Sequence, residues 1–370
     1  MERYEPAMDT ALALAERGWG RVSPNPMVGA VVLAPDGEVL GEGWHDGPGT
    51  DHAEVMALRA AGPRAAGATV VCTLEPCDRF GRTPPCTRAL LDAGVARVVV
   101  AATDPHLGEG APGLAELRAA GVDVIAGLRE APSRRLNAAF ERHVRTGRPY
   151  VIWKTASSLD GKTAATDGTS RWITSPEARA DAHRWRAWAD AIVVGSRTAL
   201  ADDPALTVRD VPSSIEARPP MRVLVDSAGR VPVGGALTDG AAPTIVATTE
   251  RMPDARADGW IEAGVDVAIL PADVAGAVDL GALVAHLGKR DVQGLLLEGG
   301  ATLAWSFVRD DLVDRVIAYV APALVGGTAA PGILGGGGFA PIDAARRFTF
   351  TDVARVGPDI RVEADVHRDR

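Results

Sequence analysis

The sequence predicts an α/β protein with two domains, on three observations. Its 370 residues suit two domains better than one, because domains average roughly 150 residues. Short apolar segments alternate with helical patterns along both halves of the chain. An arginine-rich stretch at 128–148 then ends in the helix-breaking sequence TGRP at 146–149. We therefore expect one domain at 1–148 and a second at 149–370.

The first half predicts an α/β sandwich around a largely buried sheet. Its strands are short and rich in branched apolar residues, and we expect them at 28–33, 39–44, 68–74, 97–102 and 122–125. The turn at 35–37, with sequence PDG, joins the first two strands as a hairpin. Helices are expected at 8–17, 52–61, 87–93 and 114–120, followed by one basic connecting helix within 128–148.

The second half continues the alternation. Strands are expected at 150–155, 191–195, 222–226, 244–248, 265–270, 295–298 and 315–320. The clearer helices lie at 176–188, 280–289 and 302–309, and an antiparallel pair at 348–356 and 360–364 ends the chain. A glycine run at 335–338 is interpreted as a mobile loop.

Composition excludes several classes of protein. The formal net charge of −9 argues against binding to nucleic acid or to an anionic membrane surface, since both need a basic face. No apolar run approaches the roughly 18 residues of a membrane span, and the polar N-terminus has no signal-peptide core. Three cysteines are too few for a disulfide scaffold and suit a reducing compartment, so we expect a cytoplasmic protein.

The first half carries a pattern typical of a catalytic zinc site. His52 and the cysteines Cys77 and Cys86 supply three ligands and leave a fourth position for water. Glu54 follows His52 by two residues at a predicted helix start, where it can face that position without binding the metal. This order, H-x-E followed by P-C and a second Cys, is the zinc deaminase pattern, in which the glutamate is the general acid and base.

The chemistry requires these residue types. Zinc lowers the pKa of bound water, so a nucleophile is available at neutral pH for attack on an amino-bearing ring carbon. Glu54 would carry the proton from water to the ring nitrogen and then to departing ammonia. Cys72 is expected to be a core thiol. His45 could be a fourth ligand of a closed structural site, but we favour a substrate contact.

The second half lacks a G-x-G-x-x-G motif after its first strand, so it is not a dinucleotide-binding domain of that type. It does contain LLLEGGAT at 295–302. An apolar strand, an acidic residue, two glycines and a helix start follow one another there. Such a glycine-containing connection from a strand to a helix lets backbone N–H groups approach a pyrophosphate.

Several motifs together resemble one family. In the first half these are PNPMVG (24–29), HAEV (52–55), TLEPC (73–77) and GRTPPC (81–86). In the second half they are KTASSLDGK (154–162), SRWITS (170–175), GSRTALADDPALTVR (195–209) and VDS (225–227). In this order they resemble the riboflavin-biosynthesis deaminase–reductase family, over nearly the whole chain.

The resemblance implies a fold and two activities. The first domain would have a cytidine-deaminase-like α/β/α sandwich fold and the second a dihydrofolate-reductase-like α/β fold. With one zinc ion, the first would deaminate 2,5-diamino-6-(5-phosphoribosylamino)pyrimidin-4-one. The second would use NADPH to reduce the product to 5-amino-6-(5-phosphoribitylamino)uracil. The resemblance also implies a homodimer through the reductase domain, or a tetramer.

The resemblance further implies roles for individual residues. Asn25 and His45 would contact the pyrimidine–ribose substrate, and Arg82 would lie near its phosphate. The family's usual histidine two positions after the first cysteine is replaced by Arg79, which puts that substrate contact in doubt. Cofactor contacts would come from Ala156, Trp172, Thr198, Asp202, Ser227 and the segment 300–306, which includes Gly300, Ala301 and Thr302. Substrate contacts in the second domain would come from Ser170, Arg186, Leu206, Arg209 and Glu298.

Lys154 and Asp202 are the residues expected beside the reacting ribose. Arginine suits the substrate phosphate because its guanidinium binds such groups bidentately. The proton donor stays open between Lys154, Asp202 and solvent.

Three other interpretations compete with this one. A deaminase acting on another base or on nucleic acid, with a non-catalytic C-terminal domain, would keep the zinc site. The nine-residue step between Cys77 and Cys86 speaks against nucleic-acid-editing enzymes, which normally have C-x-x-C. In a non-catalytic, zinc-stabilised binding protein, Glu54 would have no role. A narrower alternative keeps the deaminase and makes only the reductase domain inactive.

Overall fold

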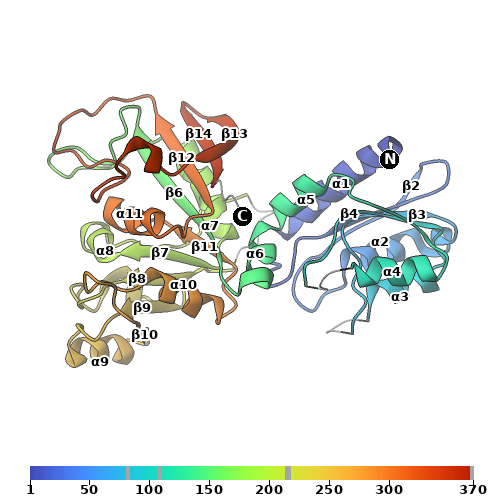
Figure 1. The fold of residues 1–370 in the computed structure, drawn as a ribbon, viewed down its shortest axis with the longest axis horizontal. Coiled ribbons are helices and arrows are strands. Elements are labelled where there is room, and N and C mark those ends of the chain that lie inside the picture. The colour runs from blue at the N-terminus through green and yellow to red at the C-terminus, as the bar shows by residue number, and fades with distance from the viewer. Residues whose placement is uncertain (81–83, 107–109, 213–217, 367–370) are drawn as a thin grey trace. The chain divides into compact units, whose positions relative to one another are not determined.

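The computed structural model describes residues 1–80, 84–106, 110–212 and 218–366. The chain divides after Gly147 into two compact units (Figure 1). The described residues up to Gly147 make up the first unit, and those of Arg148–Pro212 and from Arg218 onward make up the second. Within these residues no helix is both long and apolar enough to cross a membrane.

The first unit is built on a five-stranded sheet of order β2-β1-β3-β4-β5. The strands are β1 (Gly29–Leu33), β2 (Val39–Trp44), β3 (Thr69–Leu74), β4 (Arg97–Ala102) and β5 (Asp123–Ala126). β1 runs antiparallel to β2 and β3, whereas β3, β4 and β5 are parallel. All five predicted strands are confirmed.

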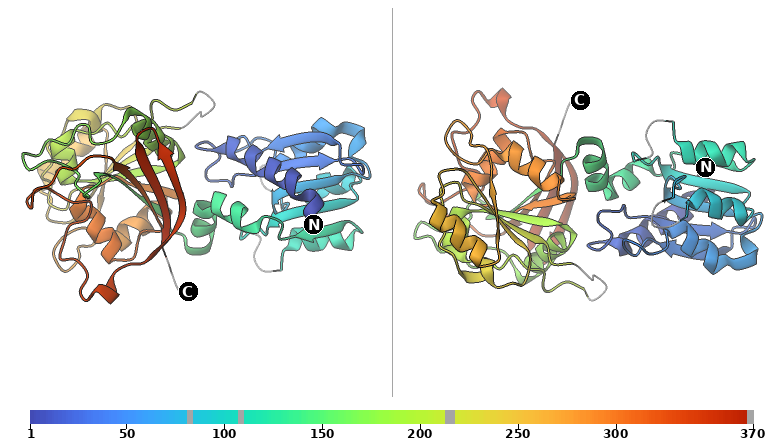
Figure 2. Two further views of the ribbon diagram at one scale, coloured as in Figure 1. Left: turned by 90° about the horizontal axis from the view of Figure 1, so that it is seen from above. Right: turned by 90° about the horizontal axis from the view of Figure 1, so that it is seen from below.

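Helices cover both faces of this sheet (Figure 2). They are α1 (Glu5–Ala15), α2 (Ala53–Ala61), α3 (Cys86–Asp92), α4 (Pro112–Ala119), α5 (Glu130–Leu136) and α6 (Ala138–Thr146). The side chains of successive strand residues point to opposite faces: Val31 and Val71 pack against α1, whereas Val70 and Cys72 pack against α2, α3 and α4. Each face therefore has its own apolar layer, as the predicted sandwich requires.

The arginine-rich stretch forms two helices, so the prediction of one connecting helix was wrong. α5 ends at Leu136 and α6 begins at Ala138, and the buried side chain of Asn137 between them bonds to the backbone of Met27. Three of its arginines pair with acidic side chains of the same unit: Arg129 with Glu5 and Asp9, Arg134 with Glu130 and Glu141, and Arg145 with Glu141. Part of the positive charge of this stretch is therefore balanced within the first unit.

The second unit contains a nine-stranded sheet of order β10-β9-β8-β7-β11-β6-β12-β14-β13. Its strands are β6 (Tyr150–Ser158), β7 (Ala191–Gly195), β8 (Met221–Val225), β9 (Thr244–Thr248), β10 (Asp266–Ile269), β11 (Gly294–Leu297), β12 (Arg315–Ala321), β13 (Phe348–Val356) and β14 (Asp359–Val366). The first seven in this order are parallel, and β14 and β13 add an antiparallel pair. Every strand predicted for this half is confirmed.

Five helices accompany this sheet: α7 (Pro176–Trp188), α8 (Ser196–Asp202), α9 (Asp254–Glu262), α10 (Leu280–Gly288) and α11 (Ala301–Arg309). α8 and α9 were not predicted. α8 begins directly after β7, so no turn residues mark its start in the sequence. α9 buries only Trp260, so its sequence has no clear apolar period. Short 3₁₀ turns lie at Glu2–Tyr4, Glu16–Gly18, Gly62–Ala65, Gly235–Thr238 and Ile342–Ala344.

Candidate active sites

The first site lies where α2 and α3 begin, beside the end of β3. His52 is the N-cap residue of α2, Cys86 is the first residue of α3, and Cys77 follows β3 by three residues. Tight packing fixes α2 against β2, because a Cβ atom on Gly43 would lie only 2.2 Å from the carbonyl oxygen of Ala53. The glycine thus lets the start of α2 approach the sheet closely.

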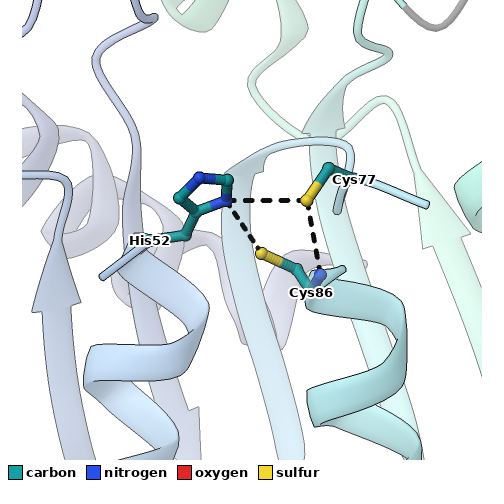
Figure 3. Close-up of side chains that lie close together, drawn as sticks. All are labelled: His52, Cys77 and Cys86. Carbon is teal, nitrogen blue, oxygen red and sulfur yellow. Dashed lines mark hydrogen bonds between the residues drawn. The ribbon is translucent and has the colours of Figure 1, made fainter. Parts of the chain in front are cut away.

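The side chains of His52, Cys77 and Cys86 converge (Figure 3). Nδ1 of His52 lies 3.1 Å from Sγ of Cys86 and 3.6 Å from Sγ of Cys77. All three ligand atoms lie within 4.8 Å of one another. Tetrahedral zinc holds such atoms roughly 3.5 Å apart, so one imidazole and two thiols fit a zinc ion with a free fourth position.

The surroundings favour the thiolate form of Cys77. Its pKa lies well below the ordinary value because it accepts hydrogen bonds from the Cys86 thiol and from His52, although burial opposes the shift. The backbone N–H of Cys86 donates a further bond to Cys77 Sγ at 3.3 Å. Thiolate is the form that binds a metal.

Glu54 lies in the first turn of α2 and is 3% exposed. Burial raises its pKa to about 7, although the charge of His52 acts in the opposite direction. Its carboxyl group also contacts the Cys86 thiol. The glutamate therefore faces the cluster from the helix that carries His52.

Two of the three predicted substrate residues of this site are in contact with each other. Asn25 Nδ2 lies 2.9 Å from His45 Nε2, and His45 Nδ1 lies 3.2 Å from the carbonyl oxygen of Asp51. The His45 ring meets the His52 ring edge-on at 5.4 Å, so this pair borders the cluster. Burial lowers the pKa of His45.

Of the remaining residues singled out near this site, Arg82 lies outside the described residues. Arg79 is exposed and lies 3.5 Å from its neighbour Asp78. Cys72 is buried within β3, as expected for a core thiol. Burial raises its pKa well above the ordinary value.

The second site lies at the carboxyl end of β11, between β6 and β7. In β11, Leu297 pairs with Trp153 of β6 on one side and with Val193 of β7 on the other. Glu298, which directly follows β11, therefore lies beside Lys154 of β6 at the carboxyl end of β11. This end of the strands is where open parallel sheets bind ligands.

Glu298, Arg186 and Lys154 form a nearly buried charge cluster. The Arg186 guanidinium donates two hydrogen bonds to the Glu298 carboxylate, at 2.8 and 2.7 Å, and Lys154 Nζ lies 3.9 Å from it. Burial alone would raise the pKa of Glu298, but the charges of Arg186 and Lys154 lower it below its ordinary value. The carboxylate is therefore held ionised between two cations.

His183 belongs beside this cluster and was missed by the sequence analysis. It lies three residues before Arg186 in α7 and is 6% exposed, and its Nδ1 accepts a hydrogen bond from the backbone N–H of Arg209 at 3.3 Å. Burial lowers its pKa to about 4, and the charges of Arg186 and Arg209 act in the same direction. The spacing H-x-x-R on one helix face was the available signal.

The segment at 206–209 joins the cluster through its backbone. Arg186 also donates to the carbonyl oxygen of Thr207 at 3.1 Å. Leu206 is buried with φ of +50°, a left-handed conformation that is strained for a residue with a Cβ atom. Strained residues are concentrated at functional sites.

The predicted cofactor residues occupy the neighbouring loops. Thr198 Oγ1 accepts from the backbone N–H of Gly300 at 3.1 Å, which links α8 to the start of α11. Ala301 and Thr302 are the first two residues of α11, and Thr302 Oγ1 accepts from Arg197 at 3.3 Å.

The other predicted residues are more dispersed. Ser227 Oγ accepts from the backbone N–H of Val278 at 2.9 Å, and Ala156 lies in β6 opposite Tyr319 of β12. Trp172 is 65% exposed with the Arg179 guanidinium 4.3 Å from its ring centroid. Ser170 is half-buried, whereas Asp202 is exposed, and the Asp202 carboxylate lies 4.0 Å from Arg171.

Comparison with known proteins covers both units. Residues 1–102 match the cytidine and deoxycytidylate deaminase zinc-binding region, and residues 149–362 match the RibD C-terminal domain. The riboflavin biosynthesis protein RibD of Escherichia coli K12 is 42% identical over 95% of this chain and 96% of its own length. The RibD protein of Mycobacterium tuberculosis H37Rv is 41% identical over 97% and 96%.

Solved structures agree over the whole length. RibD of Acinetobacter baumannii has a TM-score of 0.87 and 37% identity, with 99% of each chain covered. A Thermotoga maritima diaminohydroxyphosphoribosylaminopyrimidine deaminase and 5-amino-6-(5-phosphoribosylamino)uracil reductase has a TM-score of 0.85 and 33% identity, again with 99% of each chain covered. The expected deaminase-like and reductase folds are confirmed by these matches.

Proposed function

Because the chain belongs to the RibD family of bifunctional deaminase–reductases of riboflavin biosynthesis, we propose that it catalyses two successive reactions on one small phosphorylated substrate. The first hydrolyses the amino group of 2,5-diamino-6-(5-phosphoribosylamino)pyrimidin-4-one. The second reduces the ribosyl group of the product, giving 5-amino-6-(5-phosphoribitylamino)uracil. Zinc serves the first domain and NADPH the second. The convergence of His52, Cys77 and Cys86 beside Glu54 is the observation that carries the proposal.

In the deaminase, His52, Cys77 and Cys86 would hold the zinc ion. When bound, zinc supplies the Lewis acidity that makes water a nucleophile at neutral pH. The Glu54 carboxylate would accept the proton of the attacking water, deliver it to the ring nitrogen, and transfer the next one to the departing ammonia. Burial of Glu54 keeps competing solvent away from its carboxyl group.

Asn25 and His45 would hold the pyrimidine and ribose. Their mutual hydrogen bond supports this role, because it orients both side chains beside the metal ligands before substrate binds. Arg82 would contact the phosphate.

In the reductase, Lys154 and the ion pair of Arg186 with Glu298 would surround the reacting ribose. NADPH supplies the hydride when bound, and its contacts would come from Ala156, Trp172, Thr198, Asp202, Ser227 and 300–306. Ser170, Leu206 and Arg209 would complete the substrate site. Reduction of the open-chain imine also needs a proton at nitrogen, for which Lys154, Asp202 and solvent are candidates.

The domain limits, location and assembly are parts of the same proposal. We propose a boundary between 148 and 149; the RibD C-terminal match, which starts at residue 149, supports it, and the compact units divide one residue earlier, after Gly147. A cytoplasmic location suits free thiols that serve as metal ligands, because reducing compartments keep them from forming disulfides. A homodimer through the reductase domain, or a tetramer, is expected.

A coupled assay on the full-length, zinc-loaded chain tests the two-step proposal. With the diaminopyrimidine substrate and NADPH, one ammonia should be released for each NADPH oxidised. Ammonia release without NADPH oxidation would exclude the reductase activity. Deamination of an oligonucleotide, without turnover of the free pyrimidine, would instead support a nucleic-acid-editing enzyme.

A further inference from the structure

The chain has two asparagines, Asn25 and Asn137, and the fold connects both to one loop. Asn137 lies between α5 and α6 and is 5% exposed. Its Oδ1 accepts from the backbone N–H of Met27 at 2.8 Å, and its Nδ2 donates to the backbone C=O of Met27 at 2.9 Å. One buried side chain thus satisfies both backbone groups of a residue two positions after Asn25.

The loop is also held at its two ends, because the backbone N–H of Asn25 donates to the carbonyl oxygen of Val22 at 2.8 Å and Met27 packs in a small apolar cluster with Ala15 and Val22. Asn25 lies between Pro24 and Pro26, and proline has no backbone N–H to donate. The side chain of Asn25 in turn contacts a residue outside the loop, because its Nδ2 lies 2.9 Å from His45 Nε2. Asn137 therefore connects, through Met27, to the side chains expected to hold the substrate.

A second buried side chain of the same segment reaches the other side of the site. Ser133 lies in α5 four residues, or about one turn, before its C-cap residue Asn137, so the two side chains leave the same side of this segment. Ser133 is fully buried, and its Oγ donates to the carbonyl oxygen of Thr73 at 2.5 Å. Thr73 Oγ1 in turn accepts from the backbone N–H of Gly29 at 3.1 Å. The α5 segment thus contacts both β3, which leads to Cys77, and the residues that follow the Asn25 loop.

We propose that Asn137 is a positioning residue for deamination, acting through Met27 to place Asn25 and His45 for substrate binding. This inference rests on the proposed function of the first domain. It also means that residues 130–146, which lie beyond the zinc-binding region matched at 1–102, support the deaminase site.

The loss of this amide should affect substrate binding more than metal binding. Without it, the buried N–H and C=O of Met27 have no partner, and the loop must shift to satisfy them. The metal-binding side chains stand on α2, on α3 and after β3, so they do not depend on this loop.

The experiment compares Asn137→Ala with the wild-type chain, both full length and zinc-loaded. The KM for deamination of the diaminopyrimidine should rise at least about tenfold, with kcat changed by less than about threefold. Zinc content should be unchanged. Reduction of separately supplied deaminated product should also be unchanged, which makes the reductase domain an internal control.

Phe140→Ala separates positioning from general stability. Phe140 is buried in α6 at 9% exposure, and its truncation should lower Tm without raising the KM for deamination. An unchanged KM in Asn137→Ala would overturn the inference, as would an equal rise in Phe140→Ala.

Asn137→Asp decides the matter if the alanine variant does not fold. It keeps the acceptor for the Met27 N–H but loses the donor to the Met27 C=O, so a rise in KM of about threefold or more supports the inference and an unchanged KM overturns it. A wild-type chain that does not deaminate the pyrimidine would instead contradict the proposed function itself.

Discussion

At the scale of single residues, each site contains a buried glutamate whose charge is set by its surroundings. Burial dominates at Glu54 and raises its pKa to about 7. At Glu298 the charges of Arg186 and Lys154 outweigh burial and lower the pKa. The same residue type can therefore carry a proton in one site and remain a fixed anion in the other.

Glu54→Gln should abolish deamination and spare the rest of the protein. The amide keeps the size of the side chain but cannot accept a proton, so kcat for deamination should fall by about 10³-fold or more. Zinc content and reduction of supplied intermediate should match the wild type. Glu42→Gln, at an exposed position of β2, is the control. Retained deamination in Glu54→Gln would favour a zinc-stabilised binding protein.

The pH dependence of stability should report on His183. Arg186, Arg209, Glu298 and Asp210 face it, and its pKa in the folded protein is about 4, below the ordinary value of about 6.5. Between these values the unfolded chain binds the extra proton, so this histidine's contribution to stability is complete above pH 6.5 and is lost as pH falls.

His183→Asn should remove this dependence, because Oδ1 can accept the Arg209 hydrogen bond without titrating. From pH 7.5 to pH 5 the wild type should lose about 2 kcal/mol more unfolding free energy than the variant, measured by denaturant titration. His106→Asn, at an exposed position, should follow the wild type. Parallel curves for the wild type and His183→Asn would show that this histidine does not titrate differently on folding.

At the scale of elements, the glycine run at 335–338 is packed against α11. The backbone N–H of Gly335 donates to the carbonyl oxygen of Ala301 at 3.0 Å. Gly336 has φ of +73°, and a Cβ atom there would lie 2.1 Å from the Trp305 ring. The run lies outside helices and strands, as the interpretation as a loop expects, and its lack of side chains serves close contact with the helix.

Gly336→Ala should consequently weaken NADPH binding, since 300–306 are the proposed cofactor contacts. The added Cβ must displace Trp305 or the loop, and the KM for NADPH should rise about fivefold, with deamination unchanged. Gly337→Ala is a matched control, because a Cβ atom at Gly337 would have no neighbour within 4 Å. Equal kinetics for the two variants would show that the packing of this loop does not support the cofactor site.

At the scale of the whole molecule, the residues proposed for the two reactions belong to two units, each with its own hydrophobic core. One apolar cluster comprises strand and helix residues of the first unit, and another comprises those of the second. The candidate zinc ligands His52, Cys77 and Cys86 belong to the first unit, and Lys154, Arg186 and Glu298 belong to the second.

Zinc removal should therefore divide the two activities. After treatment of the full chain with a chelator, deamination should fall about 100-fold or more, because no other group activates the water. NADPH-dependent reduction of supplied intermediate should persist, and added zinc should restore ammonia release. Joint loss of both activities would indicate that folding of the reductase unit depends on the metal.

The sequence alone determined the α/β class, the strands and the short motifs, because apolar period and metal-ligand spacing are local properties of the chain. His52, Glu54, Cys77 and Cys86 were identified in this way. Tertiary structure decided which distant residues meet. Three contacts join segments that are far apart in the sequence: Asn137 with Met27, His183 with Arg209, and Gly336 with Trp305. Such contacts depend on strand order and helix packing, which no local pattern encodes.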